Sequence, residues 1–311
     1  MEVKNLTKIA IVTDSTAYLA QNICDRLHIT VAPISVAFGD QQYRERIDIS
    51  DAEFYKRLKT EKTFPTTAPP SMGVMEELYH NLAEAGYEEV VSIHLSSGIS
   101  GFTNNLRAFA ASVTEIKVHV VDAQIAVQPL GYLVIQAAKM AAEGKSTQDI
   151  MAKVTELRAT IGEYFIVDDL KNLAHSGRLG NSSAFVGSLL KVKPILALNK
   201  EKFNIEAVDK VRSMKRARAN IVSRFILGPT LSVVLLMKQK IYLIRFGCFY
   251  VGQITNQKLR SGNKAFNLNW QMSPLLKRDR SVQWLVPIWD PACLQFYGLK
   301  KYSKCKRGRE K

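Results

Sequence analysis

The stretch VVSIHLSSGISGF, residues 90–102, decides the fold of this chain. Its first half is a run of β-favouring residues, its middle is a turn of serine and glycine, and a helical pattern begins at Phe102. In an α/β sheet, such a loop lies at the carboxyl end of its strand, where the free N–H groups of the following helix carry a partial positive charge. The stretch therefore predicts a small anion-binding site.

The residues around this stretch alternate between strand and helix patterns. Strands are predicted at residues 9–13, 31–38 and 117–121, and helices at 17–27, 51–59, 73–85, 102–113, 130–143 and 146–160. Alternation at this spacing indicates an α/β fold in which a mostly parallel sheet is covered on both faces. Asp14 ends the first strand and is expected to cap the helix that follows.

A proline-rich segment, FPTTAPPS at residues 64–71, interrupts the pattern. Residues before a proline are pushed toward extended backbone, so the segment is predicted to be a stiff, non-helical loop that carries hydroxyl groups.

The pattern of the sequence changes after residue 164. A short strand at 164–167, a strand at 193–198 and a third at 203–208, paired with the second across a polar turn, predict a smaller unit. We therefore assign residues 1–164 to an N-terminal α/β lobe and residues 165–311 to a second α/β lobe.

Composition excludes several classes of protein. With 47% hydrophobic and 23% charged residues, the chain can bury a core and is not expected to be disordered. We find no signal-peptide pattern, and the longest late apolar stretch, residues 225–237, is too short to span a bilayer. The four cysteines show neither pairing nor metal-ligand spacing. We expect a cytoplasmic protein with no transmembrane segment and no metal.

No convincing catalytic set is present. His94 and His119 lie in predicted strands, where a hydrogen-bonded core histidine is more common than a general base. A serine hydrolase that uses Ser97 or Ser100 with one of these histidines remains an alternative.

A binding site agrees better with the pattern, because hydroxyl groups recur at turns that lead into helices. Thr67 lies in the proline-rich loop, and Ser96, Ser97 and Ser100 lie in the loop at 96–101. Hydroxyls and helix-end N–H groups together can hold a carboxylate. The alternative is that these residues only cap helices and form turns.

Six segments in the same order resemble the DegV family of bacterial fatty-acid-binding proteins, over about residues 8–218. They are IVTDSTA at 11–17, PTT at 65–67, IHLSSGISG at 93–101, VDDL at 167–170, SGRL at 176–179 and LLKVKPIL at 189–196.

The resemblance implies two α/β lobes with a long-chain fatty acid between them and no other cofactor. The carboxylate would be held by Thr67 and Ser100, with Ser96, Ser97, His94 and Asp14 as secondary candidates. Some relatives present the bound acid to a fatty-acid kinase, and Arg178 would then contribute to partner docking or offset phosphate charge. The alternative is that Arg178 only forms a surface salt bridge. Many relatives have Ser-Gln-Pro after the threonine, whereas this chain has Ala68-Pro69-Pro70, so one hydroxyl near the head group is missing.

The last part of the chain differs in composition. Residues 232–311 contain 16 of the 43 Lys and Arg residues but only 3 of the 28 Asp and Glu residues, together with all three tryptophans. Read from the third base of each codon, residues 282–298 can encode a His-Leu-Gly-Pro-Gly ending of the kind that relatives have. We therefore hypothesise that residues 219–311 are atypical because of a frameshift between about 218 and 240.

The competing interpretation of the basic tail is a genuine polyanion-binding segment that contacts nucleic acid or an anionic membrane through residues 300–311. No sequence-specific nucleic-acid partner is expected. A frameshift would leave the second lobe incomplete.

Overall fold

The computed structural model describes residues 7–61, 63–166, 173, 175–179, 193–199, 201–213, 216–217, 220–221, 232–237 and 240–245. At its centre is a four-stranded parallel sheet in the order β2-β1-β6-β7. Its strands are β1 (Ile9–Asp14), β2 (Ile29–Ala32), β6 (Glu89–His94) and β7 (Lys117–Asp122). The predicted α/β fold with a mostly parallel sheet is confirmed.

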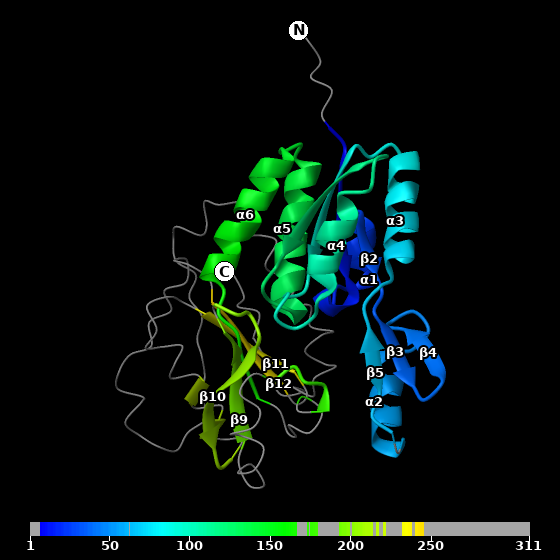
Figure 1. The fold of residues 1–311 in the computed structure, drawn as a ribbon. Helices are drawn as coiled ribbons and strands as arrows, with labels where there is room; N and C mark the ends of the chain where they lie inside the picture. Colours follow the sequence, from blue (N-terminus) through cyan, green and yellow to red (C-terminus); the bar gives the residue numbers. More distant parts are fainter. Residues whose placement is uncertain are drawn as a thin grey trace, which may run out of the picture.

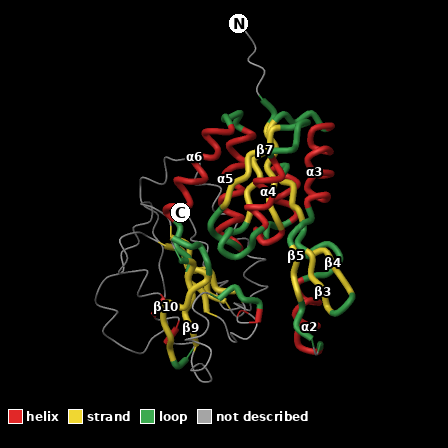
Figure 2. The backbone as a smooth tube through the Cα atoms, in the orientation of Figure 1, coloured by secondary structure: helices red, strands yellow, loops and turns green. Residues whose placement is uncertain are grey.

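Five helices flank this sheet (Figures 1 and 2). They are α1 (Gln21–Leu27), α3 (Met72–Glu84), α4 (Phe102–Ala110), α5 (Val127–Ala142) and α6 (Thr147–Thr160). Buried aliphatic side chains of the strands pack against them in one continuous core that contains Ile93, Leu106, Leu133 and Ile150, all fully buried. This core fixes the positions of the loops at the two sheet edges.

The helix predicted from residue 17 begins later than expected. Ser15–Ala17 form a short 3-10 turn, η1, and α1 begins only at Gln21. Tyr18 ends the turn in the left-handed region, at φ +51°, and this conformation cannot continue a right-handed helix. Asp14 does cap the turn, since its side chain accepts a hydrogen bond from the Thr16 N–H.

The prediction of one strand over residues 31–38 is also wrong. The chain crosses from β2 into a second, three-stranded antiparallel sheet, β4-β3-β5, formed by β3 (Ser35–Phe38), β4 (Gln41–Arg44) and β5 (Thr66–Ala68). Together with α2 (Asp51–Thr60) it has its own small core around Phe38 and Ile49. We call residues 33–70 the arm; it projects from the carboxyl edge of the central sheet (Figure 1).

A third sheet follows residue 163. It consists of β8 (Tyr164–Ile166), β9 (Lys193–Leu198) and β10 (Ile205–Val211), antiparallel in the order β10-β9-β8. The predicted pairing of β9 with β10 is confirmed. An antiparallel hairpin of β11 (Ser232–Met237) and β12 (Lys240–Arg245) lies against β8. We propose that these strands form a second lobe that begins near residue 164.

Most of the atypical segment 219–311 lies outside the described residues. So do residues 184–190 and most of 168–175, for which the sequence pattern predicts two short helices. The out-of-frame hypothesis and the polyanion-binding alternative stay predictions. An uninterrupted gene, together with an expressed peptide from residues 258–300, would contradict the frameshift.

The strand order creates a switch point between β1 and β6. From β1 the chain moves outward to β2 on one side, and from β6 it moves outward to β7 on the other. Loops diverge at such a point and leave a crevice beyond the carboxyl ends of the strands, which is the usual ligand position in open α/β sheets. Both the arm and the second lobe lie beyond this edge (Figure 1).

Gly131 tests the packing of α5 on the switch point. A Cβ at this position would lie 2.5 Å from the carbonyl oxygen of Ala17, in the turn after β1. We expect Gly131→Ala to lower the free energy of unfolding by about 1–3 kcal/mol because backbone would have to move. Gly73→Ala is the control, since a Cβ there meets nothing within 4 Å and a helical alanine is favoured. Equal urea-unfolding midpoints for the two variants would contradict this packing.

Candidate functional site

The Ser-Ser-Gly loop, residues 95–101, connects β6 to α4 at the switch point. Its backbone coils at once: the N–H groups of Ile99 and Ser100 both donate to the carbonyl of Ser96. Ser100 is half-buried, and its hydroxyl oxygen accepts a hydrogen bond from the Phe102 N–H at 3.3 Å. The loop therefore lies at the carboxyl end of β6 and leads into the N-terminus of α4, as the sequence predicts.

Ser96 has a different environment from Ser100. Its side chain is fully buried, and its Oγ donates to the carbonyl oxygen of Phe203 at 2.6 Å. The same Oγ accepts from the Gly98 N–H at 3.2 Å. Phe203 lies in the turn between β9 and β10, so this hydrogen bond joins the second lobe to the loop.

Gly98 is needed at the same contact. A Cβ on this residue would lie 2.3 Å from the backbone of Lys202 and Phe203, a distance that no side chain tolerates. The glycine is therefore required by the close approach of two backbones and not by an unusual backbone angle.

A buried hydrogen-bond chain lies beneath the loop. The Asp14 carboxylate is 3.0 Å from Nδ1 of His94, and it accepts from the Leu95 N–H at 3.1 Å. The other ring nitrogen of His94 is 2.7 Å from the Ser92 hydroxyl, which in turn bonds the hydroxyl of Tyr79 at 2.9 Å. The side chains of Asp14 and His94 are both fully buried, so the chain is closed to solvent.

The electrostatics of this chain favour an ionised Asp14. Burial alone would raise the pKa of its carboxyl group, but hydrogen bonds from His94, Thr16 and Leu95 and the charge of His94 outweigh burial, so the pKa is lowered. Burial also raises the pKa of the Tyr79 phenol to about 12, which keeps it a neutral donor. Asp14 and His94 thus support the loop from below and do not face the crevice.

The hydrolase alternative gains no geometric support. Both ring nitrogens of His94 are engaged by Asp14 and Ser92, and His119 pairs with Glu89 at 2.8 Å near the opposite edge of the sheet. Within the described part of the chain, no hydrogen bond joins Ser97 or Ser100 to a histidine. Both histidines are hydrogen-bonded strand residues, as predicted, but only His94 lies in the core, because His119 is partly exposed.

Thr67 lies on the arm and not in a loop. It occupies the middle of β5, opposite Val36, and its side chain is exposed. Among the described residues, no hydrogen bond links β5 to the Ser-Ser-Gly loop. The structure therefore places Thr67 and Ser100 on separate elements on the same side of the sheet and gives no direct contact between them.

The arm touches the second lobe beside Arg178. The ring of Phe64, three residues before Thr67, lies 5.0 Å from the ring of His175. Arg178 follows a turn at Gly177, which has φ +68°, and Leu179 then bridges to Ile205 of β10. Arg178 is half-exposed on this turn.

Two acidic residues that hold these loops were missed by sequence reasoning. Asp122, at the end of β7, accepts hydrogen bonds from the N–H groups of Ser97 and Gln124. Glu45, on the arm, accepts from the Ser15 hydroxyl at 2.5 Å, and burial raises the pKa of its carboxyl group although this hydrogen bond offsets part of the shift. The position of Asp122 at the end of a predicted strand could have identified it from the sequence, whereas nothing in the sequence around Glu45 indicates its role.

Comparison with known proteins agrees with this architecture. The model of the DegV family, described as a family of uncharacterised proteins, matches residues 8–245. The chain belongs to the DegV family. The match continues past residue 218, where the sequence resemblance was expected to end, and includes both strands of the β11–β12 hairpin.

Several DegV relatives are close in sequence or structure. A DegV domain-containing protein of Halalkalibacterium halodurans is 41% identical over 220 residues, which are 71% of this chain and 77% of the relative. The crystal structure of DegV, a fatty acid binding protein from Bacillus subtilis, is 38% identical with a TM-score of 0.65 over 70% of this chain and 76% of that one. A fatty acid binding DegV family protein from Streptococcus agalactiae is 29% identical with a TM-score of 0.67, over 73% and 81%.

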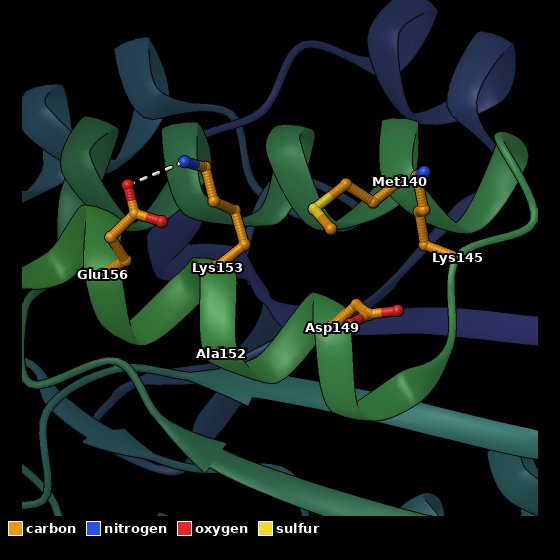
Figure 3. A pocket seen from close by; sticks show the side chains of 6 residues that line it. All are labelled: Met140, Lys145, Asp149, Ala152, Lys153 and Glu156. Carbon is orange, nitrogen blue, oxygen red and sulfur yellow. Dashed lines mark hydrogen bonds and ion pairs between the residues drawn. The ribbon is translucent and has the colours of Figure 1, made fainter.

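A shallow depression between α5 and α6 is separate from the Ser-Ser-Gly loop. Met140, Lys145, Asp149, Ala152, Lys153 and Glu156 line it, and an ion pair joins Lys153 to Glu156 at 2.8 Å (Figure 3). It lies near the opposite end of these helices from the Ser-Ser-Gly loop.

Neither a metal-binding group nor a helix that could span a membrane is found in the described residues. They contain no group of three or more His, Cys, Asp or Glu side chains that could hold a metal ion. None of the helices found in them has the length and apolar character needed to cross a membrane.

The lowered pKa of Asp14 makes stability depend on pH. A folded-state pKa below the ordinary 3.8 contributes stability above that pH, and this stability is lost as the pH falls through the folded value. We expect Asp14→Asn to have a free energy of unfolding about 1–3 kcal/mol lower than that of the wild type at pH 7. On acidification below about pH 4, the free energy of unfolding should fall less in the variant than in the wild type. Urea titrations from pH 7 to pH 3 test this, with the exposed Glu77→Gln as control. Parallel pH curves for Asp14→Asn and the wild type would contradict it.

Proposed function

We propose that this chain binds a long-chain fatty acid between its two lobes and is a carrier without catalytic activity of its own. The observation that carries the proposal is the likeness to solved DegV proteins described as fatty acid binding, over about seven-tenths of the chain. A fatty-acid-binding DegV family protein from Thermus thermophilus, 32% identical with a TM-score of 0.65, belongs to the same group.

Apolar side chains meet where the Ser-Ser-Gly loop packs on the second lobe, and the alkyl chain is proposed to lie beside them. Phe165, Leu179, Leu196 and Ile205 form a buried cluster in the second lobe, and Ile99 of the Ser-Ser-Gly loop packs against both this cluster and the core of the first lobe. At ~0.8 kcal/mol per buried CH₂, a chain of about sixteen carbons contributes on the order of 10 kcal/mol before ordering costs. The tail therefore sets affinity in this proposal.

The carboxylate end is assigned to Thr67 and Ser100. Ser100 supports this role because its oxygen accepts from the Phe102 N–H, which leaves its own O–H proton available for an anion. The exposed Thr67 hydroxyl can donate in the same way. A desolvated carboxylate is costly unless it is hydrogen-bonded, so these hydroxyls select acids over alcohols and esters.

Removal of either hydroxyl tests the assignment. We expect Thr67→Ala and Ser100→Ala each to weaken fatty-acid binding about tenfold or more, because each deletes a hydrogen bond to a charged group. Thr66→Ala is the control for Thr67, since neighbouring side chains of a strand point to opposite faces. Ser112→Ala, beyond the far end of α4, is the control for Ser100. Equal affinities for test and control variants would contradict the assignment.

Mass spectrometry of an organic extract of the purified protein tests the function itself. We expect a fatty acid in near-stoichiometric amount. Well-folded protein that carries none, and that takes up none when palmitate is added, would contradict the carrier.

We also propose that a fatty-acid kinase phosphorylates the bound acid and docks through Arg178. This role is supported by the partial exposure of Arg178, which lies three residues after His175, the residue that contacts Phe64 of the arm. We expect Arg178→Ala to leave the affinity for palmitate unchanged while it lowers ATP-dependent formation of acyl phosphate by such a kinase at least tenfold. Unchanged kinase turnover would contradict the docking role.

A further inference from the structure

We propose that Ser96 is a positioning residue that docks the second lobe onto the Ser-Ser-Gly loop, and that it is not a ligand of the carboxylate. This inference rests on the proposed fatty-acid binding and deepens it, because it separates the serines of one loop by role. It changes the status of Ser96, which the sequence places beside Ser97 as a secondary candidate for the head group.

The first argument is the position of the hydroxyl proton. A serine hydroxyl has a single proton to donate, and a carboxylate can only accept. Ser96, which is itself fully buried, donates that proton to the carbonyl oxygen of the partly buried Phe203 at 2.6 Å. Ser100 only accepts a hydrogen bond, from Phe102, so its proton is available.

The second argument is the rigidity of the partner turn. Oδ1 of Asn199 accepts from the N–H groups of Glu201 and Lys202 at 2.7 Å each, and the Phe203 N–H donates to the Asn199 carbonyl. These bonds fix the β9–β10 turn without help from the first lobe. The Phe203 carbonyl is thereby presented as a ready acceptor.

The third argument is the closeness of the backbones at Gly98. Since a Cβ there would lie 2.3 Å from Lys202 and Phe203, the turn lies directly on the loop. Ile99, the next residue, contacts the cores of both lobes. The Ser96 hydrogen bond therefore holds the β9–β10 turn on the Ser-Ser-Gly loop, near the proposed path of the alkyl chain between the lobes.

This role predicts which ligands respond to the loss of the hydroxyl. A residue that binds the carboxylate affects only ligands that have a carboxylate. A residue that docks the lobes affects burial of the tail, which the acid and the alcohol share. Ser96→Ala should therefore weaken binding of a fatty acid and of its alcohol by the same factor, and Ser100→Ala should weaken binding of the acid only.

The experiment measures dissociation constants for palmitate and 1-hexadecanol by displacement of a fluorescent fatty acid. We expect Ser96→Ala to weaken both about tenfold and to leave their ratio unchanged, because the partly buried Phe203 carbonyl loses its donor and the two lobes lose a hydrogen bond. Ser112→Ala is the control, since this exposed serine lies beyond the far end of α4 and has no part in the proposed site. Ser96→Thr, which keeps a hydroxyl, should restore binding. Weakened palmitate binding with unchanged hexadecanol binding would overturn the inference, and so would no change for either ligand.

Two further measurements keep the inference testable if Ser96→Ala folds poorly or the wild type binds no lipid. Gly98→Ala disturbs the same contact without removing the hydroxyl and should also weaken both ligands, whereas Gly101→Ala, where a Cβ meets nothing within 4 Å, should not. In ligand-free protein, hydrogen exchange of residues 199–205 should quicken at least threefold in Ser96→Ala but not in Ser112→Ala. Unchanged exchange would overturn the docking role even where the proposed function has failed.

Discussion

The buried carboxylate of Asp14 is the constraint on which the rest of the structure depends. A charge in the interior is costly unless hydrogen bonds replace its lost water, and Asp14 satisfies this need through Thr16, His94 and Leu95. These partners belong to the ends of two neighbouring strands. The end of β1 and the start of the Ser-Ser-Gly loop therefore cannot move apart without leaving a charge unpaired.

The loop divides its groups among three tasks as a result. Its first residue, Leu95, is bound to Asp14, and Ser97 is held by Asp122 through its backbone N–H. Ser96 and Gly98 face the second lobe. Ser100 comes last, after the backbone has turned into α4, and its hydroxyl keeps a proton to donate. A loop anchored on one side and covered on the other retains few groups for a ligand, so the order of residues matters more than their number.

The central sheet and its helices could be predicted from the sequence because their signals are local. Strand runs such as residues 90–95 and the helical pattern after Phe102 reflect burial of neighbouring residues. The arm could not be predicted in the same way. The run 31–38 looks like one strand, but the chain crosses between sheets at Pro33 and Ile34, and the partner of β3 is the proline-rich segment some thirty residues later.

The roles of the serines show the same limit. Ser96, Ser97 and Ser100 are equivalent in a sequence, since each is a hydroxyl in a turn before a helix. They differ in the structure because Phe203, more than a hundred residues away, takes the proton of one of them. The residues near Ser96 in the sequence give no sign of a hydrogen bond to a partner so far along the chain. Only the family resemblance distinguished Ser100 beforehand.

The proposed head-group site has a physical consequence for ligand exchange. Thr67 belongs to the arm, which has its own core and is tied to the first lobe by few contacts, among them Glu45 to Ser15 and Arg46 to the carbonyl of Leu19. Ser100 belongs to the rigid first lobe. A carboxylate held by both would bridge the arm and the first lobe, so the ligand would itself stabilise their arrangement. If the tail contributes most of the binding free energy, as proposed, departure of the ligand would depend chiefly on separation of the lobes, and the arm would follow.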